Sequence, residues 1–241
     1  MIGVKIMSSS LFKEIKRRAK QGTAEHSYED LMKIREQGAI DASDAITRNR
    51  EESALKSILG RSGILPLHQG CTIENYVVND HLQAFARDFS KNYIERFNNN
   101  FGSCFIFSGG TGTGKNHLSS AICNALMLQG KTCLVITVTE LMIKMRKCYG
   151  DTAEYSEDQF ISQLISFDLL VIDEVGLQKG SDHEKIILNQ VIDQRIGHLK
   201  PVGVLTNLDH NSVKDVLGER IFDRLKSNNS QWIPFNWNSY R

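Results

Sequence analysis

The sequence predicts an α/β fold in which a parallel five-stranded sheet is flanked by helices and preceded by a small N-terminal helical domain. From residue 103 onward, short apolar runs alternate with helical patterns. A glycine-rich loop at residues 109–114 follows the first of these runs. Residues 1–60 lack β-branched runs and show helical spacing instead. Continuous apolar strands that alternate with helices are typical of parallel sheets covered on both faces.

Five apolar runs are the candidate strands. They span residues 104–107, 133–136, 169–172, 202–205 and 232–235. We expect the last run at an edge of the sheet, because Pro234 has no N–H to donate to a neighbouring strand. A helix is expected over residues 79–98, where an apolar stripe with helical spacing predicts packing on the sheet. The stripe consists of Leu82, Phe85, Ala86, Phe89, Tyr93 and Phe97.

Composition divides the chain into three parts. Residues 1–60 are too few and too polar to bury a large core alone, so we expect their helices to lie against a partner. A capping-box pattern at Ser27 and Asp30 marks one of these helices. Residues 61–78 are expected to be a linker, because Gly63 and Pro66 interrupt the helical pattern there. Residues 79–241 are expected to form the sheet domain.

Charge and cysteine content exclude several classes of protein. The net charge of +1 over 241 residues means that any nucleic-acid contact must come from local patches. The five cysteines are odd in number and include no Cys-x-x-Cys, which argues against a disulfide framework and against a zinc site. We therefore expect reduced thiols and a cytoplasmic protein. No stretch of the chain approaches the roughly 20 apolar residues of a membrane span.

The glycine-rich loop matches the phosphate-binding pattern G-x-x-x-x-G-K. Its residues and the two that follow are Gly109, Gly110, Thr111, Gly112, Thr113, Gly114, Lys115, Asn116 and His117. Glycines let backbone N–H groups close around phosphate oxygens, and the start of the next helix adds its positive end. Lys115 would supply a charge for the β- and γ-phosphates. Because a strand precedes the loop and a helix follows it, we interpret it as an ATP-binding P-loop.

Asn116 departs from the general pattern, in which Ser or Thr follows the lysine and ligates Mg²⁺ through its hydroxyl group. An asparagine carbonyl could still be an oxygen ligand, although it is longer and neutral. Slow ATP hydrolysis would be one consequence.

Two acidic residues, Asp173 and Glu174, end the third candidate strand. The carboxyl ends of parallel strands line the ligand crevice of such folds. Asp173 is suited to orient Mg²⁺, and Glu174 is suited to orient or deprotonate the attacking water. Asn207 follows the fourth strand, where a polar side chain could help to hold that water, and Thr206 is the neighbouring candidate.

Two arginines, Arg220 and Arg224, stand four positions apart in residues 218–225, where a helix is expected. On a helix they share one face. Two guanidinium groups on one face suit the charge of a γ-phosphate, often across a subunit boundary. Pairing of Arg220 with Asp223 within the helix is the alternative.

These motifs together resemble the AAA+ ATPases and, more narrowly, the bacterial DnaC-type loaders of the replicative helicase. The resemblance rests on residues 61–69 (RSGILPLHQ), 112–118 (GTGKNHL), 121–124 (AICN), 168–174 (DLLVIDE) and 235–241 (FNWNSYR). It covers the chain from about residue 60 to the end. The Gly-Lys-Asn variant is itself a feature of this subfamily, so Asn116 supports the assignment. A phage or prophage version of such a loader fits the resemblance as well as a host version does.

The resemblance implies roles for particular residues. Lys115 would be the phosphate lysine, Asp173 and Glu174 the metal and water residues, and Asn207 the sensor. Arg224 would reach the ATP of a neighbouring subunit, with Arg220 beside it. ATP and Mg²⁺ would be the cofactors of a slow ATPase stimulated by DNA or a partner. The N-terminal helices would hold the hexameric helicase, and assembled AAA+ domains would grip single-stranded DNA. The chain leaves no room for a C-terminal lid, which the family also lacks.

Two polar segments are candidates for contact with DNA. Lys144, Arg146, Lys147 and Tyr149 follow the second strand and combine basic with aromatic side chains, as single-strand binding does. Lys179, Ser181, His183 and Lys185 follow the acidic pair. Solvated surface is the alternative for both.

Three other functions stay open on the sequence. A transposition helper ATPase of related fold would bind duplex DNA and a transposase. A P-loop kinase for a small metabolite should show a substrate lid, and the paired arginines fit it poorly. An adaptor that binds nucleotide without turnover is consistent with Asn116.

Overall fold

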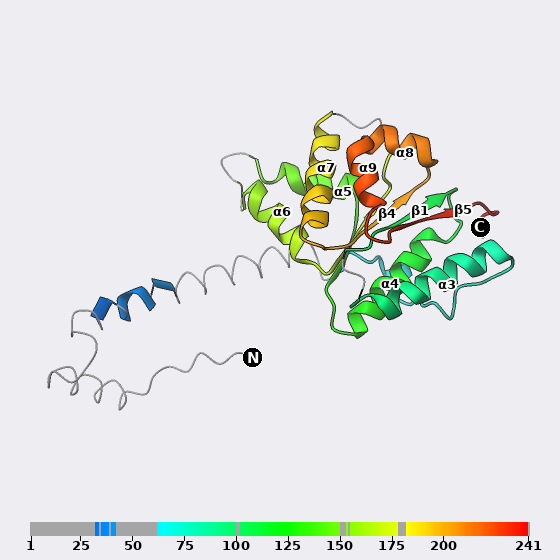
Figure 1. The fold of residues 1–241 in the computed structure, drawn as a ribbon, viewed down its shortest axis with the longest axis horizontal. Coiled ribbons are helices and arrows are strands. Elements are labelled where there is room, and N and C mark those ends of the chain that lie inside the picture. The colour runs from blue at the N-terminus through cyan, green and yellow to red at the C-terminus, as the bar shows by residue number, and fades with distance from the viewer. Residues whose placement is uncertain are drawn as a thin grey trace, which may run out of the picture. The chain divides into compact units, whose positions relative to one another are not determined.

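The structure, a computed structural model, describes residues 32–33, 35–38, 40–41, 62–99, 102–149, 153, 155–177 and 182–240. The chain divides into two compact units, Met1–Ala54 and Leu55–Arg241. In the first unit the described residues, all within 32–41, are helical. The remaining residues of that unit lie outside the described part of the chain, and so do the predicted capping box and Lys179 and Ser181. The second unit contains the sheet (Figure 1).

The sheet has five strands in the order β2-β3-β4-β1-β5. The strands are β1 (Phe105–Gly109), β2 (Cys133–Thr137), β3 (Leu169–Asp173), β4 (Val202–Thr206) and β5 (Gln231–Phe235). Every neighbouring pair is parallel. The prediction of a parallel five-stranded sheet is therefore confirmed, and β5 with Pro234 lies at an edge as expected.

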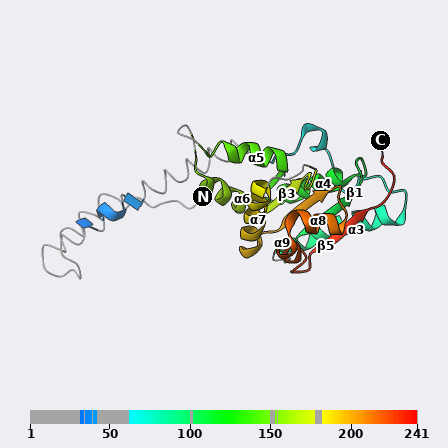
Figure 2. The same ribbon diagram turned by 90° about the horizontal axis from the view of Figure 1, so that it is seen from above.

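Helices cover both faces of this sheet (Figures 1 and 2). On one face lie α3 (His81–Arg96) and α4 (Lys115–Leu128). The other face carries α5 (Val138–Arg146), α6 (Glu157–Ser166), α7 (Asp182–Gly197), α8 (His210–Leu217) and α9 (Glu219–Leu225). A short 3-10 helix, η1 (Pro66–His68), precedes α3. Among the described residues, no helix is both long and apolar enough to cross a membrane.

The aromatic stripe of α3 packs on the sheet through its C-terminal half. The Tyr93 ring meets that of Phe105 edge-on at 5.1 Å, and the Phe89 ring meets that of Phe107 at 6.0 Å. Phe85 differs from the expectation, because its side chain is 54% exposed. Buried Gln83 and Ala86 flank it in the sequence, so the buried face of α3 turns away from Phe85.

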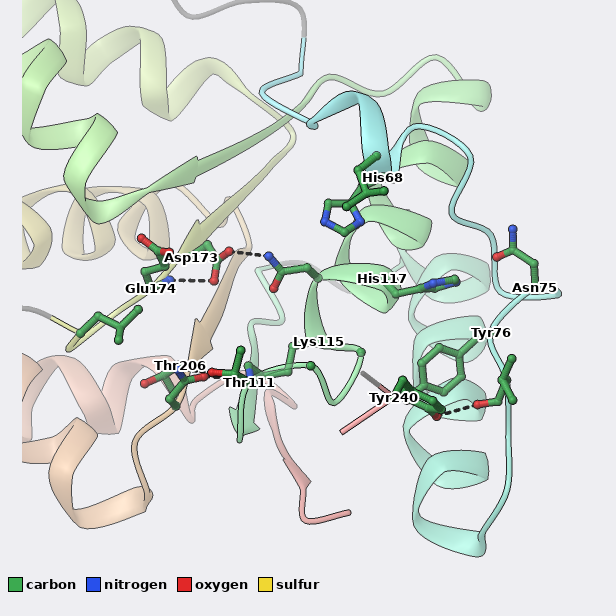
Figure 3. A pocket seen from close by; sticks show the side chains of 17 residues that line it. His68, Asn75, Tyr76, Thr111, Lys115, His117, Asp173, Glu174, Thr206 and Tyr240 are labelled. Carbon is green, nitrogen blue, oxygen red and sulfur yellow. Dashed lines mark hydrogen bonds between the residues drawn. The ribbon is translucent and has the colours of Figure 1, made fainter. Parts of the chain in front are cut away.

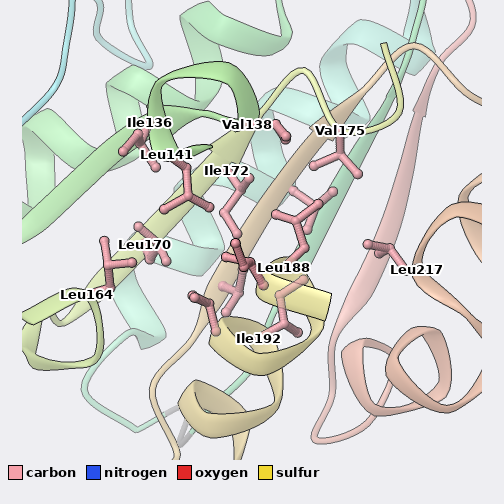
Figure 4. Close-up of a cluster of buried hydrophobic side chains, with 14 of the residues drawn as sticks. Ile136, Val138, Leu141, Leu164, Leu170, Ile172, Val175, Leu188, Ile192 and Leu217 are labelled. Carbon is pink, nitrogen blue, oxygen red and sulfur yellow. The ribbon is translucent and has the colours of Figure 1, made fainter. Parts of the chain in front are cut away.

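The opposite face of the sheet has an aliphatic core (Figure 4). Ile172 from β3 and Ile136 from β2 point into it. Leu141 of α5 lies beside Ile136, and Leu188 and Ile192 of α7 lie over the central strands. This core fixes α7 against the strand that ends in Asp173.

Residues 62–78, predicted as a linker, pack against α4 and β2. Ile64 and Tyr76 are buried in the same core as α4. The Asn124 amide of α4 donates to the carbonyl groups of His68, Gln69 and Cys71 at 2.9–3.2 Å. This segment therefore forms a fixed wall beside the P-loop.

Arg195 of α7 is fully buried, a position that the sequence analysis did not single out. Its guanidinium group donates to the carbonyl groups of Leu164, Phe167 and Pro201 at 2.5, 3.1 and 2.8 Å. Burial lowers the pKa of Arg195 to about 10, so the group stays charged at neutral pH. These bonds tie the end of α6 to the segments that lead into β3 and β4.

Candidate nucleotide-binding site

The P-loop connects β1 to α4, and two of its glycines are required by close contacts. Gly109 has a φ of 154°, and a Cβ there would lie 2.4 Å from the carbonyl oxygen of Phe235. Gly114 has a φ of 94°, and a Cβ there would lie 2.7 Å from the Tyr76 ring. Gly114 is also the N-cap of α4, and no side chain caps the first turn. The first N–H groups of α4 therefore remain available to an anion.

Lys115, the first residue of α4, is largely buried beneath this loop. Its Nζ donates to the carbonyl oxygens of Gly109 and Gly110 at 2.6 and 2.7 Å and to Asn207 Oδ1 at 2.9 Å. Burial lowers the pKa of Lys115, and the charge of Asp173 opposes that shift. The ammonium group thus lies at the centre of the loop, where phosphate oxygens could replace the carbonyl groups as acceptors.

The acidic pair, Asp173 and Glu174, lies at the end of β3, across the pocket from Tyr76 and Tyr240 (Figure 3). Asp173 Oδ2 accepts a hydrogen bond from Asn116 Nδ2 at 2.7 Å, and Asp173 Oδ1 accepts one from the Glu174 backbone N–H at 2.7 Å. The Asn116 amide oxygen is left for another partner. Asp173 and Asn116 therefore offer neighbouring oxygen atoms, a donor set that suits Mg²⁺ held by few protein ligands together with phosphate. Glu174 is exposed at the pocket.

Of the two candidate sensor residues, only Asn207 presents its polar group to the P-loop. Its Oδ1 accepts from Lys115, and its Nδ2 lies 3.5 Å from Thr111 Oγ1. Thr206 is 1% exposed, and its hydroxyl group donates to the Val175 carbonyl group at 2.7 Å. The geometry therefore favours Asn207 as the residue that faces the phosphates.

The cavity beside the P-loop has a volume of about 650 Å³. The predicted residues that line it are Thr111, Gly112, Gly114, Lys115, Asn116, His117, Asp173, Glu174, Thr206 and Asn207. Three predicted loop residues do not line it. Gly109 and Gly110 contribute the carbonyl groups that accept from Lys115, and Thr113 Oγ1 closes the loop by donating to the Gly110 carbonyl group at 2.8 Å.

A second wall of the cavity was missed by sequence reasoning. It is formed by Leu67, His68, Asn75, Tyr76 and Val77 from the segment before α3, and by Tyr240 from the end of the chain. Figure 3 shows the two tyrosines together across the pocket from the acidic pair. The motifs at residues 61–69 and 235–241 were visible in the sequence, but their spacing gave them no role.

The last described residues hold the outer side of the P-loop. Trp237 Nε1 donates to the Thr113 carbonyl group at 2.9 Å, and the Tyr240 backbone N–H donates to the Gly112 carbonyl group at 3.0 Å. The Tyr240 hydroxyl group donates to the Val77 carbonyl group at 2.6 Å, which joins this tail to the second wall. These bonds supply donors to two carbonyl groups of the loop, and the Thr113 carbonyl group also accepts from the Tyr76 hydroxyl group at 3.4 Å.

The two arginines lie away from this cavity, on α9. Both make an ion pair with Asp193 of α7: Arg224 through Oδ1, and Arg220 through Oδ2 at 3.7 Å. Among the described residues, the ion-pair partner of Arg220 is thus Asp193 rather than Asp223. Arg220 is 80% exposed, and Arg224 is 36% exposed. Neither could reach a nucleotide in the cavity of its own subunit without moving. The role of Asp193 as their partner could not be predicted from the sequence.

Comparison with known proteins agrees with this geometry. Residues 58–241 match the family described as IstB-like ATP binding protein. The chain is 46% identical over 207 residues to the replicative helicase loader DnaC of Escherichia coli strain K12, covering 86% of this chain and 83% of that protein. It is 45% identical over 206 residues to the replicative helicase loader DnaC of Buchnera aphidicola subsp. Schizaphis graminum, with the same two shares.

The fold also has a counterpart among solved structures. A crystal structure of the DnaC helicase loader superposes with a TM-score of 0.63 at 20% identity, covering 70% of this chain and 99% of that one. At this identity the likeness supports the fold alone, which is the AAA+ arrangement that the sequence predicted.

The tail contact predicts an effect on nucleotide affinity. Trp237→Phe keeps an aromatic ring but removes the N–H that donates to the Thr113 carbonyl group. We expect ATP affinity to fall by about three- to tenfold, because a neutral hydrogen bond contributes about 1 kcal/mol. Equilibrium binding of a fluorescent ATP analogue measures this change.

The other tryptophan supplies the control. Trp232 packs against His210 and Phe222, away from the P-loop, so Trp232→Phe should leave ATP affinity unchanged. Equal losses in both variants would show that the tail contact does not shape the loop.

Proposed function

Because the chain belongs to the IstB-like ATP-binding family and to its DnaC-type helicase loaders, we propose that it loads a replicative DNA helicase in an ATP-dependent step. The observation that carries the ATPase part is the convergence of Lys115, Asp173 and Asn207 at the carboxyl ends of neighbouring strands. A replication role would put the protein in the cytoplasm with the chromosome. Its partners would be the helicase hexamer, single-stranded DNA and further copies of this chain.

In the proposed reaction the P-loop N–H groups and Lys115 bind the phosphates of ATP. Asp173 and Asn116 would hold Mg²⁺, which supplies charge neutralisation between the β- and γ-phosphates. Glu174 orients the attacking water and accepts its proton, and Asn207 holds that water near the γ-phosphate. The protein uses this turnover as a switch between DNA-gripping and released states.

Slow turnover is part of the proposal. Asn116 donates to Asp173 Oδ2 at 2.7 Å and the Glu174 N–H donates to Oδ1, so both carboxylate oxygens already accept a hydrogen bond. A serine or threonine at this position would instead bring a small hydroxyl ligand. An adaptor without turnover is the second candidate function, and Asn116 is the observation that favours it. Measured ATP hydrolysis in the presence of DNA and the helicase separates the two.

A surface beside α5 is the proposed contact for single-stranded DNA. The Tyr149 ring lies 6.3 Å from that of His183 on α7, so parts of both predicted segments meet here. Arg146, Lys147 and Tyr149 are exposed, and they combine positive charge with a ring on which a base can stack. Lys144 is less suitable, because its side chain is 14% exposed and its ammonium group pairs with Glu140 at 3.4 Å.

The loader proposal predicts a complex with the helicase. We expect the chain to co-elute with the replicative helicase of its host in size-exclusion chromatography with light scattering, in ATP and Mg²⁺. Deletion of residues 1–60 should abolish this complex while the remaining domain still binds ATP. If no complex forms under any nucleotide condition, the loader proposal is wrong and a transposition helper ATPase becomes the leading alternative.

The proposed DNA surface predicts that loss of its positive charges weakens binding to single-stranded DNA. In fluorescence anisotropy with a labelled single strand, Arg146→Ala with Lys147→Ala should weaken DNA binding about tenfold and reduce the salt dependence, because two phosphate contacts are lost. Helicase binding should persist. Exchange of both residues of the exposed Arg87–Asp88 ion pair for alanine is the control. Unchanged DNA affinity in the Arg146 and Lys147 variant would rule this surface out.

The proposed role of Arg224 predicts complementation between inactive variants. Glu174→Gln and Arg224→Ala should each lower helicase-stimulated ATP hydrolysis by about a hundredfold or more. Mixed in equal amounts, they should recover roughly a quarter of the unaltered rate, because random head-to-tail assembly leaves that share of sites with both groups intact. The readout is phosphate release by the assembled complex.

A matched mixture provides the control for this experiment. Glu174→Gln mixed with Lys115→Ala should recover nothing, because both residues belong to the site of one subunit. Absence of recovery in the Arg224→Ala mixture as well would place Arg224 outside a shared site.

A further inference from the structure

One buried hydroxyl group at the candidate site links the segments that follow β3 and β4, and Leu208 extends this link to β1. Thr206 is the last residue of β4 and is 1% exposed. Its Oγ1 donates to the Val175 carbonyl group at 2.7 Å and accepts from the Leu208 backbone N–H at 3.1 Å. The Leu208 carbonyl group accepts from Ser108 Oγ of β1 at 2.8 Å. A chain of hydrogen bonds therefore runs from β1, through the end of β4, to the turn after β3.

The turn after β3 holds Glu174 in an unfavourable backbone conformation. Its φ is 62°, in the left-handed region that residues with a Cβ rarely adopt. The Glu174 N–H donates to Asp173 Oδ1 at 2.7 Å, and the Val175 N–H donates to the Leu205 carbonyl group at 3.1 Å. The bond from Thr206 to Val175 completes this set. Conformations of this kind persist only where surrounding bonds fix them, and they gather at functional sites.

The turn after β4 depends on the same hydroxyl group. Its bond with the Leu208 N–H spans Asn207 and closes a tight turn around that residue. Asn207 Oδ1 then meets Lys115 Nζ at 2.9 Å. The Thr206 hydroxyl group thus lies at the base of both turns, one of which presents Glu174 and the other Asn207. Each of its two roles, donor and acceptor, serves one turn.

We propose that Thr206 is a positioning residue for ATP hydrolysis, which fixes Glu174 and Asn207 relative to each other through its hydroxyl group. The inference rests on the proposed ATPase function of the site. Thr206 acts through these two residues, because its own hydroxyl group is already engaged on both sides. ATP binding, which depends on the P-loop and Lys115, does not require this bond.

The test is a pair of substitutions at Thr206 that distinguish the contribution of the hydroxyl group from that of the methyl group. Thr206→Val keeps the shape of the side chain and removes the hydroxyl group, whereas Thr206→Ser keeps the hydroxyl group. We expect Thr206→Val to lower kcat about tenfold or more, with the Kd for ATP within about twofold, because misplaced groups slow the chemical step more than binding. Thr206→Ser should retain kcat to within about threefold.

A purely structural role of the hydroxyl group predicts a different pattern. Ser90 of α3 is also fully buried, and its Oγ donates to the Ala86 carbonyl group at 2.8 Å, on the far side of the sheet. Ser90→Ala therefore removes a buried hydroxyl group at a distance from the site and should leave kcat unchanged. The proposal is overturned if Thr206→Val retains kcat, or if Thr206→Ser is impaired as strongly. If Thr206→Val does not fold, Thr206→Ala carries the same expectation.

A second readout keeps this inference distinct from the ATPase proposal. Hydrogen exchange of the Leu208 and Val175 amides should accelerate in Thr206→Val and return toward the original rate in Thr206→Ser. If the unaltered protein shows no ATP turnover with helicase and DNA, the ATPase proposal is overturned. Where turnover is present, unchanged exchange rates in Thr206→Val would overturn the positioning role, and faster exchange together with a lower kcat would support it.

Discussion

The buried Lys115 ammonium group is the feature on which the rest of the site depends. It is bound by two carbonyl groups of the P-loop and by Asn207, which directly follows β4. Only the order β3-β4-β1 brings these groups together, because it sets the ends of β1 and β4 side by side. A buried cation without such acceptors would be costly. Asp173 ends β3, the next strand along, so Lys115, Asn207 and Asp173 lie at the same edge of the sheet.

Sequence patterns predicted the features that are set by residues close together in the chain. The apolar runs gave the strands, and the glycine loop before a helix pattern gave the P-loop, since both are local in the chain. Contacts between distant segments were not predictable in this way. Residues 62–78 read as a linker because of Gly63 and Pro66, yet they pack on α4. Asp193 pairs with Arg220 and Arg224 from another helix, and periodicity contains no information about that pairing.

The architecture suggests why the chain would act as a switch rather than as a fast enzyme. Asn116 and Asp173 hold each other by a hydrogen bond in the place where other P-loop proteins carry a hydroxyl ligand. The arginines face Asp193 instead of the cavity. Among the described residues that line the cavity, Lys115 is therefore the one lysine or arginine that the proposed site offers to a γ-phosphate. Turnover would await a neighbouring subunit, and assembly on the helicase would supply one.

ATP binding by single-residue variants tests the central claim most directly. The affinities for ATP, with and without Mg²⁺, should be measured by titration calorimetry for the unaltered protein, Lys115→Ala and Asp173→Asn. The account predicts that Lys115→Ala loses affinity about tenfold or more in either condition, because a charged contact to phosphate is removed. Asp173→Asn should retain Mg²⁺-free binding and lose the gain from Mg²⁺. Binding of ATP to Lys115→Ala as tight as to the unaltered protein would contradict the assignment of this site.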